Sequence, residues 1–334
     1  METQVTRLTV ELANQLPRGT QSKPILELNL DQYTAMDEGV AEMFSDINCY
    51  SLSLNGLLGL TVADAKSLKK FKGYDLFLNG LEEISEDVAK WLSKVKGGLH
   101  LDGIRSLPAA VAQRLRREER LLSLGGLETI SDGAALGLGT GCQCLRLNGL
   151  KSISASAARN LRKDGQRLEL AGLTELSVEV AGALGAESGF LSLAGLTDIS
   201  EAAAEALASN NSALDPNGLV SLSGGAAKGL AKATHSLSLD GLQSLSDEAA
   251  AELAKSTASL SLNGLTGLSE SAAESLGRHQ GEDLALNGII ELSISAAEAL
   301  VKRQGKIGLA SLTHGNLPAK LYDDLKNKKY DFLN

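Results

Sequence analysis

Aromatic residues, cysteine and proline are scarce in this chain. Phe, Trp and Tyr together make up 3% of its 334 residues, beside 5 prolines and 3 cysteines. A core without aromatics must be built from smaller apolar side chains such as Leu and Ala. The cysteines, Cys49, Cys142 and Cys144, give no even disulfide framework, which fits a reducing compartment.

Long apolar runs are missing as well. The first residues lack the basic start and apolar stretch of a secretory signal, and no later stretch is long enough to cross a bilayer. We therefore expect a cytoplasmic protein without a membrane partner.

Positive charge is also in deficit. Lys and Arg number 32 against 41 Asp and Glu, which gives a formal net charge of −9. A general binder of phosphate backbones needs a basic surface. From the net charge we expect no nucleic-acid partner.

What the chain does have is an internal repeat. A Gly followed by Leu or Ile recurs every 23 residues, with a spacing of 24 at each end of the series. Residues 237–254, LSLDGLQSLSDEAAAELA, are nearly a full copy of the consensus L-x-L-N-G-L-x-x-L-S-x-x-A-A-x-x-L-A. The repeated glycines are Gly56, Gly80, Gly103, Gly126, Gly149, Gly172, Gly195, Gly218, Gly241, Gly264 and Gly288.

The first half of each repeat predicts a strand and a turn. The two leucines of L-x-L point to one face, as in a short strand. Asn and Gly both tolerate positive φ, so the Asn-Gly pair predicts a sharp turn. Asn, Asp, Gly and Ala alone precede the Gly, and we interpret this restriction as a demand of the backbone rather than a binding code.

The second half predicts a helix with one buried stripe. A Ser or Thr at the expected N-cap accepts a hydrogen bond from a free helix N–H, and Pro108 is the one exception. Nine residues after each Gly stands an Ala, and three further a Leu, on the same helix face. The invariant Ala indicates that the helix backbone lies close to the sheet. The N-cap residues are Thr61, Ser85, Ser131, Ser154, Ser177, Ser200, Ser223, Ser246, Ser269 and Ser293.

One repeat cannot bury both its strand and its helix, so the units must stack. The stack predicts an α/β solenoid, a horseshoe with parallel strands on the concave face and short helices on the convex face. Residues 1–50 are expected to form an N-terminal cap with a degenerate first repeat, 51–305 eleven regular repeats, and 306–334 a degenerate repeat with a C-terminal cap.

The pattern resembles the leucine-rich-repeat family over roughly residues 26–333, and is similar to its bacterial forms with short convex helices. The family hallmark, L-x-x-L-x-L-x-x-N-x-L, carries an inward Asn where this chain has Leu57, Leu81 or Ile104. We expect the Asn-Gly turn to take over the role of the family's asparagine ladder. The resemblance implies a binding scaffold and names no ligand.

The end repeats and one central repeat depart from the consensus. Leu26 and Leu28 fit the strand pattern of a first repeat, and a closing helix is expected over 318–325. Tyr330 and Phe332 suggest one last strand. In the eighth glycine repeat Pro216 takes an inward leucine position, and proline cannot donate to a sheet ladder. This predicts a local break in the sheet with one lost backbone bond.

Signals for catalysis and metal binding are weak. Cys142 and Cys144 offer two of the roughly four ligands that a zinc site needs. The histidines are scattered, and no Ser-His-Asp trio is implied by spacing. We expect no enzyme, no cofactor and no metal. The histidines are His100, His235, His279 and His314, of which His235 and His279 are expected to face solvent in helix-to-strand turns.

The outward positions of the strands form two columns on the concave face. In the first half of the chain these columns mix Phe, His, Leu, Arg and Glu, whereas beyond residue 190 they are mostly Ser, Ala and Gly. Exposed Phe and Arg are favoured at interface hot spots. An equally simple interpretation is a solvated face on which Arg146 and Glu169 pair across strands. The candidate partner-binding residues are Phe77, His100, Leu121, Arg146, Arg167, Glu169 and Phe190.

Three functions remain open at this point. The leading hypothesis is a monomeric scaffold that binds an unknown protein through its concave face. The second is a structural module whose ends stack on other copies. The third is an enzyme, which a pocket lined by His100 and acidic groups would support.

Overall fold

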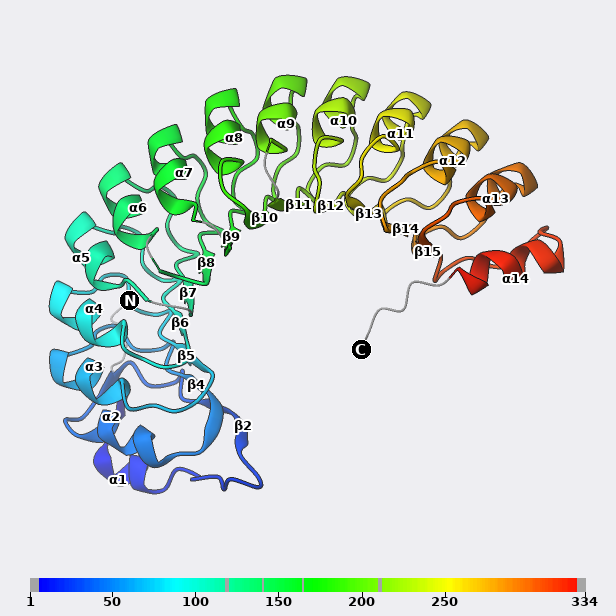
Figure 1. The fold of residues 1–334 in the computed structure, drawn as a ribbon. Coiled ribbons are helices and arrows are strands. Elements are labelled where there is room, and N and C mark those ends of the chain that lie inside the picture. The colour runs from blue at the N-terminus through cyan, green and yellow to red at the C-terminus, as the bar shows by residue number, and fades with distance from the viewer. Residues whose placement is uncertain (1–5, 118–119, 140, 164, 210–211, 329–334) are drawn as a thin grey trace. The chain divides into compact units, whose positions relative to one another are not determined.

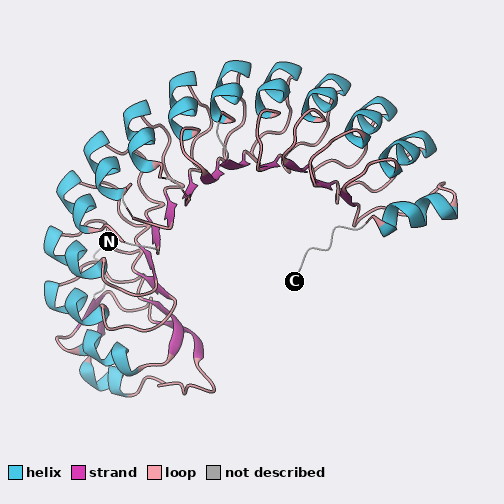
Figure 2. Cartoon of the chain, in the orientation of Figure 1, coloured by secondary structure: helices cyan, strands magenta, loops and turns pink. Residues whose placement is uncertain are grey.

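The computed structural model describes residues 6–117, 120–139, 141–163, 165–209 and 212–328. The chain divides into two compact units, Met1–Glu169 and Leu170–Asn334, which we call the N-terminal and C-terminal units. Each unit is a parallel sheet with one helix between successive strands (Figures 1 and 2). Among the described helices, none has the length and apolar character needed to span a membrane.

In the N-terminal unit a seven-stranded sheet runs in chain order from β2 to β9, and β1 and β3 pair in a separate small sheet. Its strands are β1 (Arg7–Leu8), β2 (Ile25–Asn29), β3 (Ala35–Met36), β4 (Cys49–Ser53), β5 (Asp75–Phe77), β6 (Gly98–His100), β7 (Leu121–Ser123), β8 (Cys144–Arg146) and β9 (Gln166–Glu169). Its helices are α1 (Val10–Asn14), α2 (Val40–Met43), the 3-10 turn η1 (Phe44–Asp46), α3 (Val62–Leu68), α4 (Glu86–Leu92), α5 (Ala109–Arg114), α6 (Asp132–Leu138) and α7 (Ala155–Leu161).

In the C-terminal unit six strands follow the same plan. They are β10 (Gly189–Ser192), β11 (Ser212–Asp215), β12 (Ser236–Ser238), β13 (Ser259–Ser261), β14 (Asp283–Ala285) and β15 (Lys306–Gly308). The helices are α8 (Val178–Leu184), α9 (Glu201–Leu207), α10 (Gly224–Leu230), α11 (Asp247–Leu253), α12 (Glu270–Gly277), α13 (Ile294–Val301) and α14 (Ala319–Asn327).

The strands are in register by one repeat, as the leucine pattern predicts. Leu52 lies beside Leu76, and Leu76 beside Leu99. In the C-terminal unit Leu237 lies beside Leu260 in the same way. These leucines are buried, and within each unit the strands line the concave side and the helices the convex side (Figure 2).

The expected helix starts and the buried alanine stripe are confirmed. All ten predicted Ser and Thr N-caps accept a hydrogen bond from a backbone N–H of the first turn, and Pro108 makes no side-chain cap. The alanine of the stripe is fully buried in every repeat, from Ala65 to Ala297. The helices therefore approach the sheet as closely as the sequence requires.

The sharp turn expected at the repeated glycines is present, but it forms without a positive φ at the glycine. In the described chain, positive φ occurs at other glycines, such as Gly39 and Gly141, and not at the consensus positions. A Cβ on Gly80 would instead lie 2.1 Å from the carbonyl oxygen of Asn55, one repeat earlier. The glycine is needed because two backbones approach closely, not because the chain turns in a left-handed way.

Where Asn or Asp precedes the glycine, its side chain forms a polar ladder with the next turn, as expected of the Asn-Gly turn. Asn55 Oδ1 accepts the backbone N–H of Asn79 at 2.9 Å, and Asn79 Oδ1 accepts that of Asp102 at 2.9 Å. In the C-terminal unit Asp240 Oδ1 accepts the N–H of Asn263 at 2.8 Å. At the turns with Asn or Asp the side chain thus holds the backbone of the next turn, which adds a side-chain role to the backbone demand inferred from the sequence.

The first and last repeats depart from the regular plan. Leu28 on β2 and Leu30 just after it are buried, whereas Leu26 on β2, which fits the strand pattern of the sequence, is 75% exposed. Helix α14 forms where a closing helix was expected, and Lys328 O accepts the N–H of Ile307 on β15. The suggested last strand at residues 330–332 lies outside the described residues.

At Pro216 the predicted lost bond is found, but the predicted break in the sheet is not. Strand β11 pairs with β10 over four residues and with β12 through Ala213 and Leu214. Elsewhere the residue at this position donates its N–H to the next strand, as Leu239 does to Ser261 O at 2.8 Å. Pro216 has no N–H to donate, so a single bond is missing from a continuous sheet.

Buried arginines hold several helix-to-strand turns. Arg117 donates to the carbonyls of Leu92 at 2.9 Å and Val95 at 2.8 Å, and also to that of Gly97. In the C-terminal unit Arg303 donates to Gly281 O at 2.6 Å and lies 3.2 Å from Nδ1 of His279.

His279 is 2% exposed, so the expectation that it faces solvent is wrong, whereas His235 is exposed as expected. Burial, reinforced by the positive charge of Arg303, lowers the pKa of His279 to about 4.

Candidate protein-binding face

The candidate residues lie at outward positions of the strands, as the alternation predicts. In the N-terminal unit Phe77 is level with His100, Leu121 with Cys144, and Arg146 with Glu169. The face they form has two parts, an aromatic cluster on β5 and β6 and a charged cluster on β8 and β9.

The aromatic cluster is built from Asp75, Phe77 and His100. The rings of Phe77 and His100 stack with their centroids 4.1 Å apart and an interplanar angle of 21°. His100 Nε2 lies 3.1 Å from Asp75 Oδ1, and the His100 ring is buried while Phe77 is half-buried. Phe77 therefore presents an apolar surface whose position is fixed by a neighbour that is itself held in place.

Gly98 makes this arrangement possible. It is level with Asp75 on the neighbouring strand, and a Cβ at Gly98 would lie 2.3 Å from Asp75 Oδ1 and 3.1 Å from a methyl carbon of Leu121. The carboxylate of Asp75 thus passes over the glycine to reach His100. Asp75 and Gly98 also occupy outward strand positions, but they were not among the candidate residues. The sequence signal that could have found them is an Asp on the strand before His100, level with a Gly on the strand that carries His100.

The charged cluster has Glu169 between two arginines. Nε of Arg146 lies 3.0 Å from Glu169 Oε2, and Nε of Arg167 donates to Glu169 Oε1 at 2.8 Å. The Glu169 side chain is 13% exposed, whereas the arginines are 39% and 49% exposed. The pairing of Arg146 with Glu169 is therefore present, and it leaves parts of both guanidinium groups at the surface.

Opposing effects set the ionisation of this cluster. Burial acts to raise the pKa of Glu169, but the hydrogen bond from Arg167 and the charges of both arginines outweigh it, so this pKa is lowered. Burial and the charge of Glu169 raise the pKa of the Cys144 thiol, against the two arginines. The cluster accordingly holds a carboxylate, two guanidinium groups and a neutral thiol near pH 7.

Phe190 belongs to β10 of the C-terminal unit, where it is half-buried and level with Ala213. The outward positions that follow on β12 and β13 are serines, which fits the small, polar second half seen in the sequence. Ser238 and Ser261 donate to the polar ladder at Asn217 and Asp240, so these serines support the fold as well as the face.

No protein-family model matches the sequence, and no curated protein matches it. Among solved structures, the glycosylated form of the Drosophila Toll–Spätzle complex matches 97% of this chain and 43% of its own, with 14% identity and a TM-score of 0.50. Strand, ladder turn and helix recur in both units as they do in such proteins. The chain has a leucine-rich-repeat fold.

Two further solved structures are similar to this chain. Another form of the Toll–Spätzle complex matches 96% of this chain at 14% identity with a TM-score of 0.46. A leucine-rich-repeat protein of Leptospira interrogans matches 90% of this chain and 87% of its own, at 16% identity and a TM-score of 0.41. The chain spans 50% of the Toll chain in this second form of the complex.

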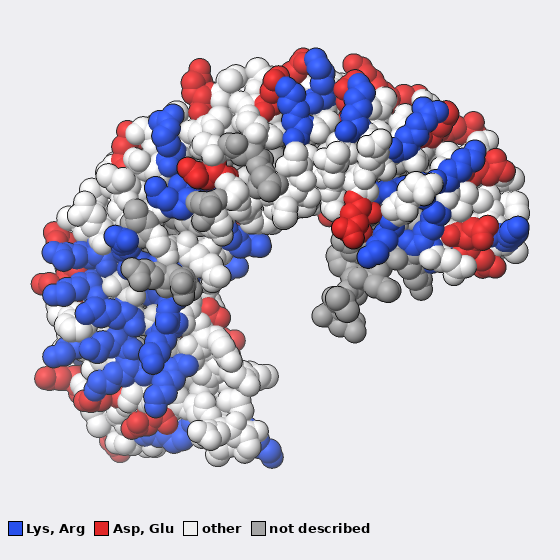
Figure 3. Space-filling view, viewed as in Figure 1, with Lys and Arg blue, Asp and Glu red and all other residues white. Residues whose placement is uncertain are grey.

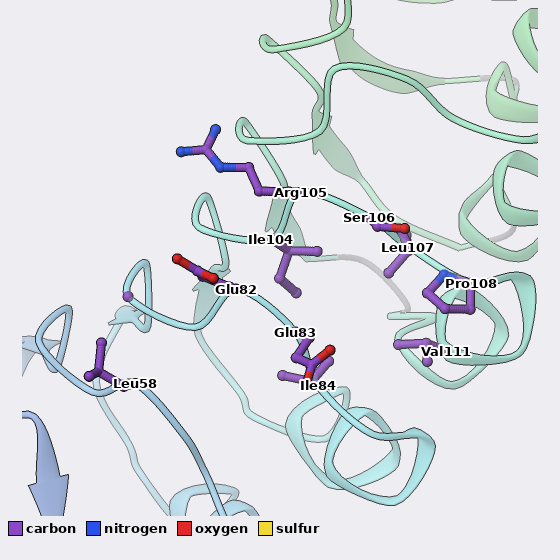
Figure 4. A pocket seen from close by; sticks show the side chains of 11 residues that line it. Leu58, Glu82, Glu83, Ile84, Ile104, Arg105, Ser106, Leu107, Pro108 and Val111 are labelled. Atoms are coloured by element: carbon purple, nitrogen blue, oxygen red, sulfur yellow. The ribbon is translucent and has the colours of Figure 1, made fainter.

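A shallow groove lies on the strand-to-helix side of the N-terminal unit. It encloses about 730 Å³ between the segments that precede α4 and α5, and Figure 4 shows Glu82, Glu83 and Arg105 at its rim. His100 does not line it, and its lining holds no pairing of a nucleophile with a histidine base. Within the described residues no three His, Cys, Asp or Glu side chains gather as a metal site would need.

Proposed function

We propose that this chain is a non-catalytic scaffold that binds a protein partner through the concave strand face. The observation that supports it most is the fixed pairing of Phe77 with His100 beside the half-exposed guanidinium groups of Arg146 and Arg167. Rigid aromatic and arginine side chains are the residues that dominate protein interfaces. The solved Toll chain, which shares the fold, is itself in complex with Spätzle.

The proposed contact residues have distinct roles. Phe77 and Leu121 offer apolar surface, and His100 supports Phe77. Arg146 and Arg167 offer N–H donors to carboxylates or carbonyls of the partner, with Glu169 holding both in place. Phe190 is proposed as a separate contact in the C-terminal unit.

The experiment starts with capture of partners on the immobilised chain, identified by mass spectrometry and then measured by calorimetry. Phe77→Ala and Arg167→Ala should each lower the affinity for the partner at least fivefold. Truncating a hot-spot residue typically costs more than about 1 kcal/mol of binding free energy. Ser236→Ala, an outward serine on β12, is the matched control and should leave the affinity unchanged. A partner that responds to Ser236→Ala and not to Phe77→Ala would show that the contact surface is elsewhere.

We also propose that the protein is a cytoplasmic monomer. Its thiols are unbridged, and burial raises the pKa of Cys49 to about 11, which keeps it unreactive. At the C-terminal end, the carbonyl of Lys328 already takes the N–H of Ile307 on the edge strand β15, which disfavours end-to-end stacking of copies. Light scattering over a concentration series should give a constant monomer mass, and a mass that grows with concentration would favour stacking.

A further inference from the structure

Charge is unevenly divided between the two units. The N-terminal unit has 21 Lys and Arg and 21 Asp and Glu, whereas the C-terminal unit has 11 and 20, so the net charge of −9 belongs to the C-terminal unit. In the N-terminal unit the positive residues gather where α3, α4 and α5 end and turn toward the next strand, and Figure 3 shows Lys and Arg side by side over this flank. We call this surface the basic flank. Its described members include Lys66, Lys69, Lys72, Lys90, Lys94 and Lys96.

Four of these lysines surround one indole. The Nζ atoms of Lys69 and Lys94 lie 4.5 and 4.6 Å from the ring centroid of Trp91, and those of Lys66 and Lys90 lie 5.8 and 5.9 Å from it. The indole attracts the ammonium groups through its π-face, while the four like charges repel one another. An anion placed among them would relieve that repulsion.

The same flank of the C-terminal unit serves as an internal comparison. There Lys228 pairs with Glu201 at 3.2 Å, Lys255 with Glu252 at 2.6 Å, and Lys232 with Glu205. In the described part of the N-terminal unit, the four lysines around Trp91 have no carboxylate partner within ion-pair distance. These three lysines of the C-terminal unit are therefore paired and the four around Trp91 are not, although Lys70 beside them does pair with Glu42 at 2.7 Å.

Exposed aromatic rings lie on the same side of the N-terminal unit, at the start of the strands. Tyr50 and Tyr74 are 42% and 70% exposed, and their ring centroids are 5.4 Å apart. Tyr74 is preceded by Lys72 and is level with Gly97 of the next repeat. Gly97 has no side chain to cover the outer side of Tyr74, so this position is open to a flat group.

The open position over Gly97 is enforced by the backbone. A Cβ at Gly97 would lie 2.3 Å from the carbonyl oxygen of Tyr74, which excludes any other residue there. The buried guanidinium of Arg117 donates to the carbonyls of Leu92, Val95 and Gly97 and so fixes the turn that carries Lys94 and Lys96. The backbone that carries Lys94 and Lys96 is therefore held in place before any ligand arrives.

We propose that the basic flank binds single-stranded nucleic acid, with phosphates on the lysines around Trp91 and an unpaired base stacked on Tyr74 over Gly97. Proteins that bind single strands combine a positive track for the backbone with aromatic rings for the bases. A lipid surface fits less well, because Trp91 is half-buried beneath lysines and cannot enter a bilayer. An acidic peptide would use the lysines but has no flat ring for Tyr74. The net charge of the whole chain, from which no nucleic-acid partner was expected, does not describe this local surface.

The test measures binding of the full chain to a fluorescent oligodeoxythymidine by anisotropy at several salt concentrations. Tyr74→Ala should weaken binding about tenfold, as expected for loss of one stacked base. The same variant should have no effect on an abasic oligonucleotide of equal length. The double variant Lys69→Ala, Lys94→Ala should weaken both oligonucleotides and reduce the dependence of log affinity on log salt by about 1.4, which corresponds to two lost phosphate contacts on a single strand.

Two controls separate this site from general attraction of anions. Lys232→Ala with Lys255→Ala removes two lysines from the same flank of the C-terminal unit and should leave oligonucleotide affinity unchanged. Fluorescence of Trp91, the one Trp in the chain, should change on titration with the oligonucleotide. A polyglutamate peptide and vesicles containing phosphatidylserine are the competing ligands, and both should bind at least tenfold more weakly.

Three results would overturn the proposal. One is equal or tighter binding of polyglutamate or of the vesicles. Another is that Tyr74→Ala lowers the affinity for the oligodeoxythymidine and for the abasic oligonucleotide by the same factor. The third is no binding of the oligonucleotide at low salt.

Discussion

Gly80 occupies a position at which the backbone conformation would accept a side chain but the space would not. A methyl group there would press on the carbonyl oxygen of Asn55, whereas nothing lies within 4 Å of a Cβ built on Gly59. We expect Gly80→Ala to lower the free energy of unfolding by about 1–3 kcal/mol, the usual cost of overpacking. Gly59→Ala should be neutral or stabilising by about 0.4–1 kcal/mol, because it restricts the unfolded chain.

Urea unfolding of both glycine variants, followed by circular dichroism, gives the comparison directly. If both variants shifted the midpoint equally, the close approach at Gly80 would not be what excludes a side chain. Gly264, whose Cβ would lie 2.1 Å from Asp240 O, repeats the experiment in the other unit.

His279 gives the second prediction at this scale. Its ordinary pKa is 6.5 and burial lowers it to about 4 in the folded chain. Between these values the unfolded ring takes up a proton and the folded ring does not, so stability falls as the pH drops from 6.5 toward 4 and is fully present above 6.5. The contribution is on the order of 3 kcal/mol, from about 1.36 kcal/mol for each pH unit.

A His279→Gln variant should lose this part of the pH dependence. The free energies of unfolding of wild type and variant are measured from pH 7.5 to pH 4. The carboxylates titrate in both proteins, so the difference between the two free energies reports the contribution of the His279 ring alone. A difference that stays constant over this range would mean that the folded ring titrates normally.

Helix α9 carries the prediction for the element scale. Ala204 is fully buried, and the neighbouring repeat packs a glycine, Gly229, against it. Ala204→Leu has no space for its extra carbons and should cost about 1–3 kcal/mol or more. Ala194→Ser, on an exposed turn, should change stability by less than about 0.5 kcal/mol. Equal melting temperatures would contradict the close contact between helix and neighbour.

At the end of strand β11 the hydrogen bond that is missing at Pro216 can be restored by substitution. Pro216→Leu would supply the missing N–H toward Ser238 and a side chain like those of the neighbouring strands. We expect a gain of about 1–2 kcal/mol, of which a backbone hydrogen bond contributes about 0.5–1.5 kcal/mol. Hydrogen exchange should show a protected amide at the new Leu. An exposed amide together with lower stability would indicate that the strand is shaped to the proline ring.

Local pattern was enough to predict the strands, their register and the helix starts, because each rests on side chains within one repeat. Leu76 and Ser85 could be placed from periodicity alone. The reason for Gly80 could not, since it depends on a carbonyl 25 residues earlier, that of Asn55, rather than on the residue's own φ. His279 was misplaced for the same reason: the repeat that buries it contributes Arg303.

The candidate site was predicted only as a set of positions. Alternation placed Phe77, His100 and Arg146 at outward positions correctly, but it says nothing of how far each is covered. The structure shows that His100 is buried beneath its neighbours and that Glu169 is largely enclosed by two arginines. Such cross-strand contacts depend on the sizes of side chains in three successive repeats, which no single repeat encodes.

On the scale of the whole molecule, acidity sets the response to salt. The sequence has an isoelectric point of about 5.1, so the excess negative charge repels itself at pH 7.5 and is neutralised near pH 5. Raising sodium chloride from low to moderate concentration should therefore raise the free energy of unfolding at pH 7.5 and have little effect near pH 5. Thermal unfolding in the two buffers measures this, and salt-induced destabilisation at pH 7.5 would show that attractive ion pairs outweigh the repulsion.

The polar ladder has a consequence for how such a gene changes length. Where the turn residue is Asn or Asp, its side-chain oxygen accepts from the turn one repeat later, as Asn55 does from Asn79, so these junctions use the same kind of donor and acceptor. Duplicating or deleting one whole unit re-forms all of these contacts. Inserting a single residue instead moves an L-x-L pair to the wrong face of the sheet. In-frame recombination between misaligned repeats is thus the genetic event this architecture accommodates, and related chains should differ in the number of units far more than in the length of any one.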